Sequence, residues 1–203
     1  MTAYIWDLDG TLLDSYGMIV EAARLTAEDN GVKDEAEYVL RAVKQGAVST
    51  YLQDVSERCG VPAEELFAQY RQHTHALDGL ITLIDGAKET LEKLERGGAV
   101  HFVYTHRGNS SGPILERLGI LDRFRAVVTS VYGLAHKPSG EGVRYLMEKY
   151  GLDPDDTWYV GDRAVDMYCA KDAGVNALLY LEPDPVVSPT GVEDRIVRDL
   201  REI

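Results

Sequence analysis

Residues 3–11 read Ala-Tyr-Ile-Trp-Asp-Leu-Asp-Gly-Thr, and this stretch decides the fold. Its apolar and aromatic start is typical of a β-strand, which is predicted over residues 3–8. Asp7 and Asp9, followed at once by a glycine, predict a turn where that strand ends. Aspartate is also common in turns and helix caps that have no chemical role, so this turn alone does not establish an active site.

Asp7 and Asp9 can carry a reaction on a phosphate ester. A carboxylate at a strand end can attack phosphorus and form an aspartyl-phosphate, which is the role predicted for Asp7. A Mg²⁺ ion beside it would offset the repulsion between this carboxylate and an anionic substrate. Asp9 would protonate the leaving alcohol and later activate water. Around them, the predicted phosphate-binding positions are Leu8, Gly10, where the backbone can approach the phosphate, and Thr11, whose hydroxyl can close the turn.

Beyond residue 86, short strands alternate with helices. Strands are predicted at residues 100–104, 126–128, 158–160 and 177–180, and helices at residues 87–95, 113–118, 142–150 and 164–173. This alternation over short connections is typical of a parallel sheet with helices on both faces. The sequence therefore predicts an α/β fold with a Rossmann-like, doubly wound parallel sheet. A proline-rich loop over 183–189 and a weak helix over 192–203 are expected to end the chain.

A helical segment separates the first strand from the rest of its sheet. Residues 15–77 show helical spacing with no convincing strand, and about four helices are predicted there. The expected organisation is a core domain of residues 1–14 and 81–203 with an inserted α-helical bundle, or cap domain, of residues 15–80. A cap inserted at this point should lie over the carboxyl end of the sheet, where open α/β folds place their ligands.

Polar side chains follow the later strands as well. Thr105 ends the strand over 100–104, and a hydroxyl there can donate to a phosphate oxygen, while His106 and Arg107 can line the same cleft and are predicted to bind phosphate or substrate. Lys137 stands at a loop–helix junction, where a cation would stabilise the charge of a phosphoryl transition state. Taken singly, each of these residues is as well explained as a helix cap or a solvated loop residue.

Asp162 and Asp166 follow the strand over 158–160. Their spacing puts both carboxylates on one side of a helix's first turn. Helix capping is one explanation, and a Mg²⁺ site is another, because hard cations take oxygen ligands. In a parallel sheet all these strand ends converge on one edge. Independent capping does not explain why that edge would receive a nucleophile, an acid, a hydroxyl donor, a cation and a metal site together.

With these motifs the sequence resembles the haloacid dehalogenase superfamily, in the branch of phosphoglycolate phosphatases and β-phosphoglucomutases. The resemblance is carried by residues 7–11, Thr105, Lys137-Pro138 and residues 161–166. It implies Asp7 as nucleophile, Asp9 as general acid and base, and Thr105 and Lys137 as phosphate binders.

The resemblance also implies the cofactor. Mg²⁺ would be held by Asp7, the backbone carbonyl of Asp9, and Asp162, with Asp166 as a further ligand or as support behind the ligands. The family's third motif usually continues Lys-Pro-x-Pro, so Gly140 in the last place is expected to loosen that loop. By analogy, a cap loop formed by Lys44, Gln45 and Gly46 is expected to reach the cleft and contact a carboxylate or phosphate of the substrate.

Asp9 favours phosphoryl transfer, because members of the family that resemble dehalogenases lack a carboxylate there. The sequence thus predicts a Mg²⁺-dependent phosphatase acting on a small phosphorylated metabolite, such as a phosphoglycolate-like compound, a sugar phosphate or pyrophosphate. A phosphomutase of the β-phosphoglucomutase type and a catalytically silent phosphate-binding module are the alternatives.

Composition limits the partners. The chain has 21 basic and 34 acidic residues, a formal charge of −13, which argues against nucleic acid and against an anionic membrane surface. No apolar run approaches the roughly 20 residues that span a bilayer, and the N-terminus lacks the basic start of a signal peptide. We therefore expect a cytoplasmic monomer or homodimer that binds neither nucleic acid nor membrane.

Overall fold

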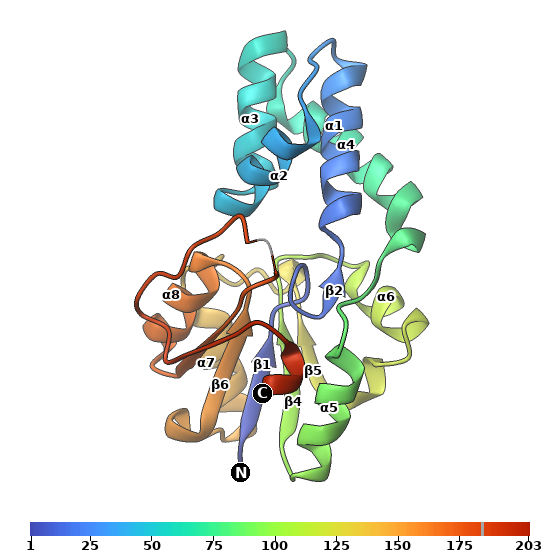
Figure 1. The fold of residues 1–203 in the computed structure, drawn as a ribbon. Coiled ribbons are helices and arrows are strands. Elements are labelled where there is room, and N and C mark those ends of the chain that lie inside the picture. The colour runs from blue at the N-terminus through green and yellow to red at the C-terminus, as the bar shows by residue number, and fades with distance from the viewer. Residues whose placement is uncertain (184) are drawn as a thin grey trace. The chain divides into compact units, whose positions relative to one another are not determined.

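The computed structural model describes residues 1–183 and 185–203 (Figure 1). The chain divides into two compact units. The first, called the α/β unit, contains Met1–Asp14 and Thr82–Ile203, and the second, called the helical unit, contains Ser15–Ile81. None of the helices in the described part of the chain has the length and apolar run needed to cross a membrane.

The α/β unit is built on one parallel sheet. Its described residues form six strands in the order β5-β4-β1-β6-β7-β8, and every neighbouring pair is parallel. The strands are β1 (Ala3–Trp6), β4 (Val100–Tyr104), β5 (Phe124–Val128), β6 (Thr157–Gly161), β7 (Asn176–Tyr180) and β8 (Arg195–Val197). In Figure 1 the blue strand β1 runs between β4 and β6. The segment that follows β1 therefore leaves from the interior of the sheet.

Four α-helices in the described part of the α/β unit lie between these strands in the chain. They are α5 (Ala87–Arg96), α6 (Ser111–Arg117), α7 (Glu141–Tyr150) and α8 (Ala164–Ala173). One face of the sheet packs Ile5 and Phe102 against Leu146 of α7 and Ala170 of α8. Each large apolar side chain buried in this way contributes roughly 1.5–3 kcal/mol.

Alternate residues of the same strands point to the other face, as the two-residue period of a strand requires. Trp6 and His101 lie there, and the His101 ring contacts the backbone carbonyl of Leu91 in α5. Helices therefore cover both faces, and the predicted doubly wound α/β fold is confirmed.

A short antiparallel ribbon, with two residues in each of its two strands, was not predicted. β2 (Leu13–Asp14) pairs antiparallel with β3 (Thr82–Leu83), and the Ile84 N–H donates to the Leu12 carbonyl at 3.0 Å. The ribbon joins the two places where the chain leaves and re-enters the α/β unit. Strands of two residues are too short to give a period-two pattern.

The predicted C-terminal helix over 192–203 is wrong. The segment forms strand β8 and a short 3₁₀ helix, η5 (Leu200–Glu202). Ile196 and Val197 are β-branched and suit a sheet edge, where Val197 is buried and accepts a hydrogen bond from the Leu181 N–H at 2.9 Å. In the predicted proline-rich loop over 183–189, residue 184 lies outside the described residues.

The helical unit holds α1 (Tyr16–Asp29), α2 (Ala36–Gln45), α3 (Val48–Cys59) and α4 (Ala63–Leu77), then a 3₁₀ turn, η1 (Asp78–Leu80). Its described residues form no strand, as the helical spacing predicted. The interior contains Ala22, Ala23, Val39, Leu52, Val55 and Leu66, all fully buried. Gly60, at φ +77°, ends α3 in a conformation that glycine adopts without strain.

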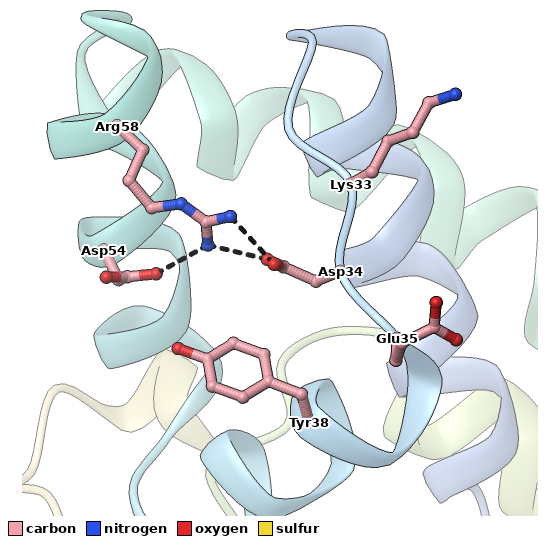
Figure 2. Close-up of a pocket in the computed structure, with 6 residues that line it drawn as sticks. All are labelled: Lys33, Asp34, Glu35, Tyr38, Asp54 and Arg58. Carbon is pink, nitrogen blue, oxygen red and sulfur yellow. Dashed lines mark hydrogen bonds and ion pairs between the residues drawn. The ribbon is translucent and has the colours of Figure 1, made fainter.

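The helical unit carries a surface pocket of about 510 Å³ lined by Lys33, Asp34, Glu35, Tyr38, Asp54 and Arg58. Figure 2 shows the Arg58 guanidinium turned toward two of the carboxylates. It donates to Asp34 at 2.8 Å through two nitrogens and to Asp54 at 3.0 Å, and the Tyr51 hydroxyl donates to Asp34 at 3.0 Å. These bonds lower the pKa of Asp34. The network ties the segment before α2 to helix α3.

The His101 side chain, on the face of the sheet that α5 covers, is uncharged. The Trp6 indole N–H donates to His101 Nδ1 at 3.1 Å, so the ring proton sits on Nε2, which lies 3.2 Å from the Leu91 carbonyl. Burial lowers the pKa of His101.

We expect this histidine to make the fold acid-sensitive. Its folded-state pKa lies below the unfolded value of about 6.5, so its stabilisation is complete above that pH and is lost as the pH falls below it. Urea unfolding at about pH 7.5 and about pH 5.5 should show a smaller pH effect on the free energy of unfolding in His101→Gln than in wild type. Equal pH effects in the two proteins would contradict this expectation.

Candidate active site

The turn after β1 is closed by backbone hydrogen bonds. The Asp7 N–H donates to a carbonyl of β6 at 2.9 Å, which keeps the residue in register with the sheet. The Leu8 carbonyl accepts from the N–H groups of residues 11–13, and the Gly10 N–H donates to Leu13. Gly10 has φ +83°, which glycine adopts without a Cβ clash. The side chain of Leu8 is fully buried, so only its backbone is available to a phosphate.

A buried ammonium lies between two carboxylates. Lys137 Nζ is 2.7 Å from Asp7 Oδ1 and 2.7 Å from Asp166 Oδ1, and the three side chains are 0%, 3% and 0% exposed. Burial alone would lower the pKa of Lys137, but Asp166 and Asp7 raise it. Burial would likewise raise the pKa of Asp166, but Lys137 and Arg163 hold it below its ordinary value. Lys137 and Asp166 are therefore a charged, fixed pair.

Asp7 behaves differently from Asp166. Burial raises the pKa of Asp7 to about 6, although the Lys137 ammonium draws it in the opposite direction. The neighbouring Asp166 carboxylate adds to the rise in the pKa of Asp7. Asp166 also accepts a second bond, from the Arg163 N–H to Oδ2 at 3.1 Å. Asp166 thus supports Lys137 with one oxygen and caps α8 with the other.

Asp7, Asp162 and Asp166 form a cluster that fits a metal ion. Each offers a carboxylate oxygen, and these oxygens all lie within 4.8 Å of one another. The three carboxylates outnumber the single ammonium that lies between two of them, and a divalent cation would offset part of their charge. Oxygen ligands of this kind suit Mg²⁺. The Thr11 hydroxyl lies 3.5 Å from Asp162 Oδ1 and so connects the first motif to the last.

The three residues that follow β4 are fixed by hydrogen bonds within the α/β unit. The Thr105 hydroxyl oxygen accepts from the Arg107 N–H at 3.1 Å. His106 Nε2 accepts from the Lys137 N–H at 2.8 Å, and burial, with the nearby Lys137 charge, lowers the pKa of His106 to about 3. A neutral histidine is the form that can accept this bond. His106 and Arg107, predicted as phosphate binders, thus have partners within the α/β unit.

Asp9 is paired with Arg107. Its carboxylate is not a member of the Asp7, Asp162 and Asp166 cluster. Arg107 Nη2 lies 2.6 Å from Asp9 Oδ1, and Nε lies 3.1 Å from Oδ1 and 3.2 Å from Oδ2. Asp7 thus has Lys137 as a cationic partner, and Asp9 has Arg107.

Gly140 anchors its loop, contrary to the expectation that it loosens it. The Gly140 N–H donates to Asp172 Oδ2 at 2.7 Å. A Cβ at this position would come within 2.6 Å of the Ala173 nitrogen, so a side chain would force the backbone apart. The peptide bond between Lys137 and Pro138 is cis.

Two aromatic rings near Lys137 carried no recognisable signal in the sequence. The ring centroids of Tyr104 and Tyr159 lie 5.6 and 5.4 Å from Lys137 Nζ, within the range of a cation–π contact. In a strand, such residues look like ordinary core aromatics. Their role depends on which side chain faces them.

Lys44 and Gln45 form the last turn of α2, and Gly46 caps it. These residues therefore end a helix and do not form a free-standing loop. Lys44 Nζ lies 4.3 Å from the centroid of the Tyr16 ring, within the helical unit. A contact between these residues and a substrate stays a prediction.

The chain matches the family described as haloacid dehalogenase-like hydrolase over residues 4–180. It is 27% identical to an N-acetylmuramic acid 6-phosphate phosphatase of Pseudomonas aeruginosa, across 100% of this chain and 93% of that protein. It is 31% identical to pyrophosphatase PpaX of Bacillus velezensis (86% and 80% covered) and 32% identical to a phosphoglycolate phosphatase of Vibrio parahaemolyticus (83% and 78%). The resemblance drawn from the motifs, and with it the assignment to the hydrolases of phosphoric esters, is confirmed.

Solved structures show a similar fold. One is a haloacid dehalogenase-like family hydrolase from Streptococcus pneumoniae, which matches this chain with a TM-score of 0.81. The match covers 100% of this chain and 96% of that protein's chain. At 21% identity this likeness concerns the fold alone.

Removing the central ammonium should strongly destabilise the α/β unit. Lys137→Met keeps most of the side-chain volume but leaves Asp7 and Asp166 buried without their cation. We expect a loss of about 3–5 kcal/mol in the free energy of unfolding, measured with urea in the presence of EDTA. Adding Asp166→Asn to Lys137→Met should recover part of that loss.

The matched control is Lys88→Met, which removes an exposed lysine and should change stability by less than about 0.5 kcal/mol. If Lys137→Met is as stable as this control, the ammonium does not hold the site together.

Proposed function

We propose that this chain, which belongs to the haloacid dehalogenase-like hydrolases, is a Mg²⁺-dependent phosphatase of a small phosphorylated metabolite and works through an aspartyl-phosphate on Asp7. The observation that carries the proposal is Lys137, whose ammonium bridges Asp7 and Asp166 while Asp162 lies within reach of both. With a divalent cation bound, such a centre could attract a phosphate and hold a nucleophile in the same place.

In the first half of the reaction, a carboxylate oxygen of Asp7 would attack phosphorus and the bond to the ester oxygen would break. Lys137 holds Asp7 Oδ1 at 2.7 Å, so Oδ2 is the oxygen left to form the new bond. Asp9 would give a proton to the departing oxygen. In the second half, Asp9 would take a proton from water, and that water would displace Asp7 from phosphorus.

Thr105 would bind the phosphoryl group. Its oxygen accepts a hydrogen bond from the Arg107 N–H, which directs the hydroxyl proton away from the backbone. Thr105 is almost fully buried and follows the strand beside β1. Its hydroxyl and the Lys137 ammonium would donate to the oxygens that gain charge in the transition state.

Asp7 and Asp162 would hold Mg²⁺ together with the backbone carbonyl of Asp9. Asp166 would stand behind them, because its two oxygens already accept from Lys137 and the Arg163 N–H. When bound, the ion would offset the charge between the anionic substrate and the carboxylates.

The substrate is proposed to be a small phosphate ester or pyrophosphate. The relatives are named for an amino-sugar phosphate, pyrophosphate and phosphoglycolate, three compounds that share only a compact size and a phosphate. A screen of such compounds for release of free phosphate would identify it. A phosphomutase would instead yield an isomeric phosphate ester.

Replacing the nucleophile should abolish turnover. Asp7→Asn is nearly isosteric but lacks the attacking carboxylate, so release of phosphate from p-nitrophenyl phosphate should fall by at least about 10³-fold. Asp122→Asn, an exposed aspartate in the same unit, should match wild type. Turnover retained in Asp7→Asn would refute the assignment of the nucleophile.

Substitutions of Asp162 and of Asp166 should affect the Mg²⁺ requirement of the enzyme differently. EDTA should silence the wild-type enzyme and Mg²⁺ should restore it. Asp162→Asn should raise the Mg²⁺ concentration for half-maximal activity by about 10-fold or more, as expected for lost metal contacts. Asp166→Asn should mainly lower kcat, since it acts on Lys137. If both variants shift the Mg²⁺ requirement equally, Asp166 is itself a ligand.

A further inference from the structure

Arg107 makes a forked contact with Asp9 that the reaction sequence above does not use. The guanidinium places two nitrogens on one carboxylate, with a shortest distance of 2.6 Å, and the arginine side chain is 9% exposed against 22% for Asp9. A planar fork restrains a carboxylate in both position and orientation, which a point charge such as lysine does not. Since water is largely excluded from the arginine, this restraint is stronger than in an exposed pair.

Arg107 is itself fixed from two sides. Its backbone N–H donates to the Thr105 hydroxyl at 3.1 Å, and its Nη1 lies 3.3 Å from the Ser110 hydroxyl. The end of β4 thereby sets the position of the fork. Thr105 lies only two residues away, so the group proposed to bind phosphate and the group that holds Asp9 stand on one short segment, joined by a hydrogen bond.

We propose that Arg107 is a positioning residue for Asp9: its fork holds the carboxylate at the place where a proton passes to the leaving oxygen. The proposal rests on the proposed function, since it assigns a partner to the general acid of that reaction. It differs from phosphate binding, the role first predicted for Arg107, because the fork is directed at Asp9.

The two roles have different consequences for different leaving groups. An arginine that binds the transferred phosphate would be needed for every phosphate ester alike. In the first half of the reaction, a residue that positions the general acid matters only when the departing oxygen needs a proton. The p-nitrophenolate ion leaves readily without one, whereas an alkoxide does not.

The test is the dependence of the first half-reaction on the leaving group, measured as the single-turnover rate at which the alcohol or phenol is released from p-nitrophenyl phosphate, phenyl phosphate and an alkyl phosphate such as glycerol phosphate. In Arg107→Met, this rate should fall by less than about 3-fold on p-nitrophenyl phosphate and by about 10²-fold on the alkyl ester, the usual range for general acid catalysis. KM should stay within about 3-fold of wild type for all three. Arg107→Lys, which keeps the charge but not the fork, should recover little on the alkyl ester.

A double-mutant cycle tests whether Arg107 acts through Asp9. If Arg107 acts through Asp9, then adding Arg107→Met to Asp9→Asn should change activity on the alkyl ester by less than about 2-fold. Arg96→Met, an exposed arginine of α5, is the matched control and should behave as wild type. Thermal unfolding of each variant shows whether it is folded, and Arg107→Lys decides the question if Arg107→Met does not fold.

Equal losses of the single-turnover rate on all three esters, or a large rise in KM, would overturn the proposal and return Arg107 to the phosphate site. Failure of the proposed function looks different. In that case the wild-type protein would release no phosphate from any of the three esters.

Discussion

The contact between Lys137 and the carboxylates of Asp7 and Asp166 is the constraint on which the site depends. An unpaired ammonium could not be buried at this depth, and neither could two unpaired carboxylates. Their burial is tolerated because the ammonium lies 2.7 Å from an oxygen of each carboxylate. The same contact aligns Asp7 for attack. Stability and reactivity are therefore coupled here, and a change at any of the three residues should affect both.

The sheet makes this contact possible. β1 lies between β4 and β6, so the residues that follow these three strands come together although they are far apart in the chain. The short segment after β4 supports both pairs. His106 accepts a hydrogen bond from the Lys137 backbone N–H, and the Arg107 guanidinium binds the Asp9 carboxylate. The result is two ion clusters on one edge, one around Lys137 and one around Asp9. Nucleophile and acid are thus held by different cations.

Much of this could be predicted from the sequence, because the strongest signals are local. The strand over 100–104 and the helix over 164–173 have the predicted bounds, since apolar runs and terminal glycines mark them. The C-terminal strand was missed because three residues carry little periodicity and their place depends on β7. The effect of Gly140 was misjudged for a related reason: its close neighbour, Ala173, lies in another helix. The pairing of Arg107 with Asp9 spans 98 positions, and no local pattern specifies it.

The central claim, that Asp7 carries the phosphoryl group, is tested most directly by trapping the intermediate. Asp9→Asn should still accept a phosphoryl group from p-nitrophenyl phosphate but activate water poorly, so a phosphorylated enzyme should accumulate. Acid quenching, digestion and mass spectrometry should then place one phosphoryl group on the peptide that contains Asp7, and Asp7→Asn should carry none. Phosphate release by the wild-type enzyme, with the label on another residue or on none in Asp9→Asn, would contradict the account.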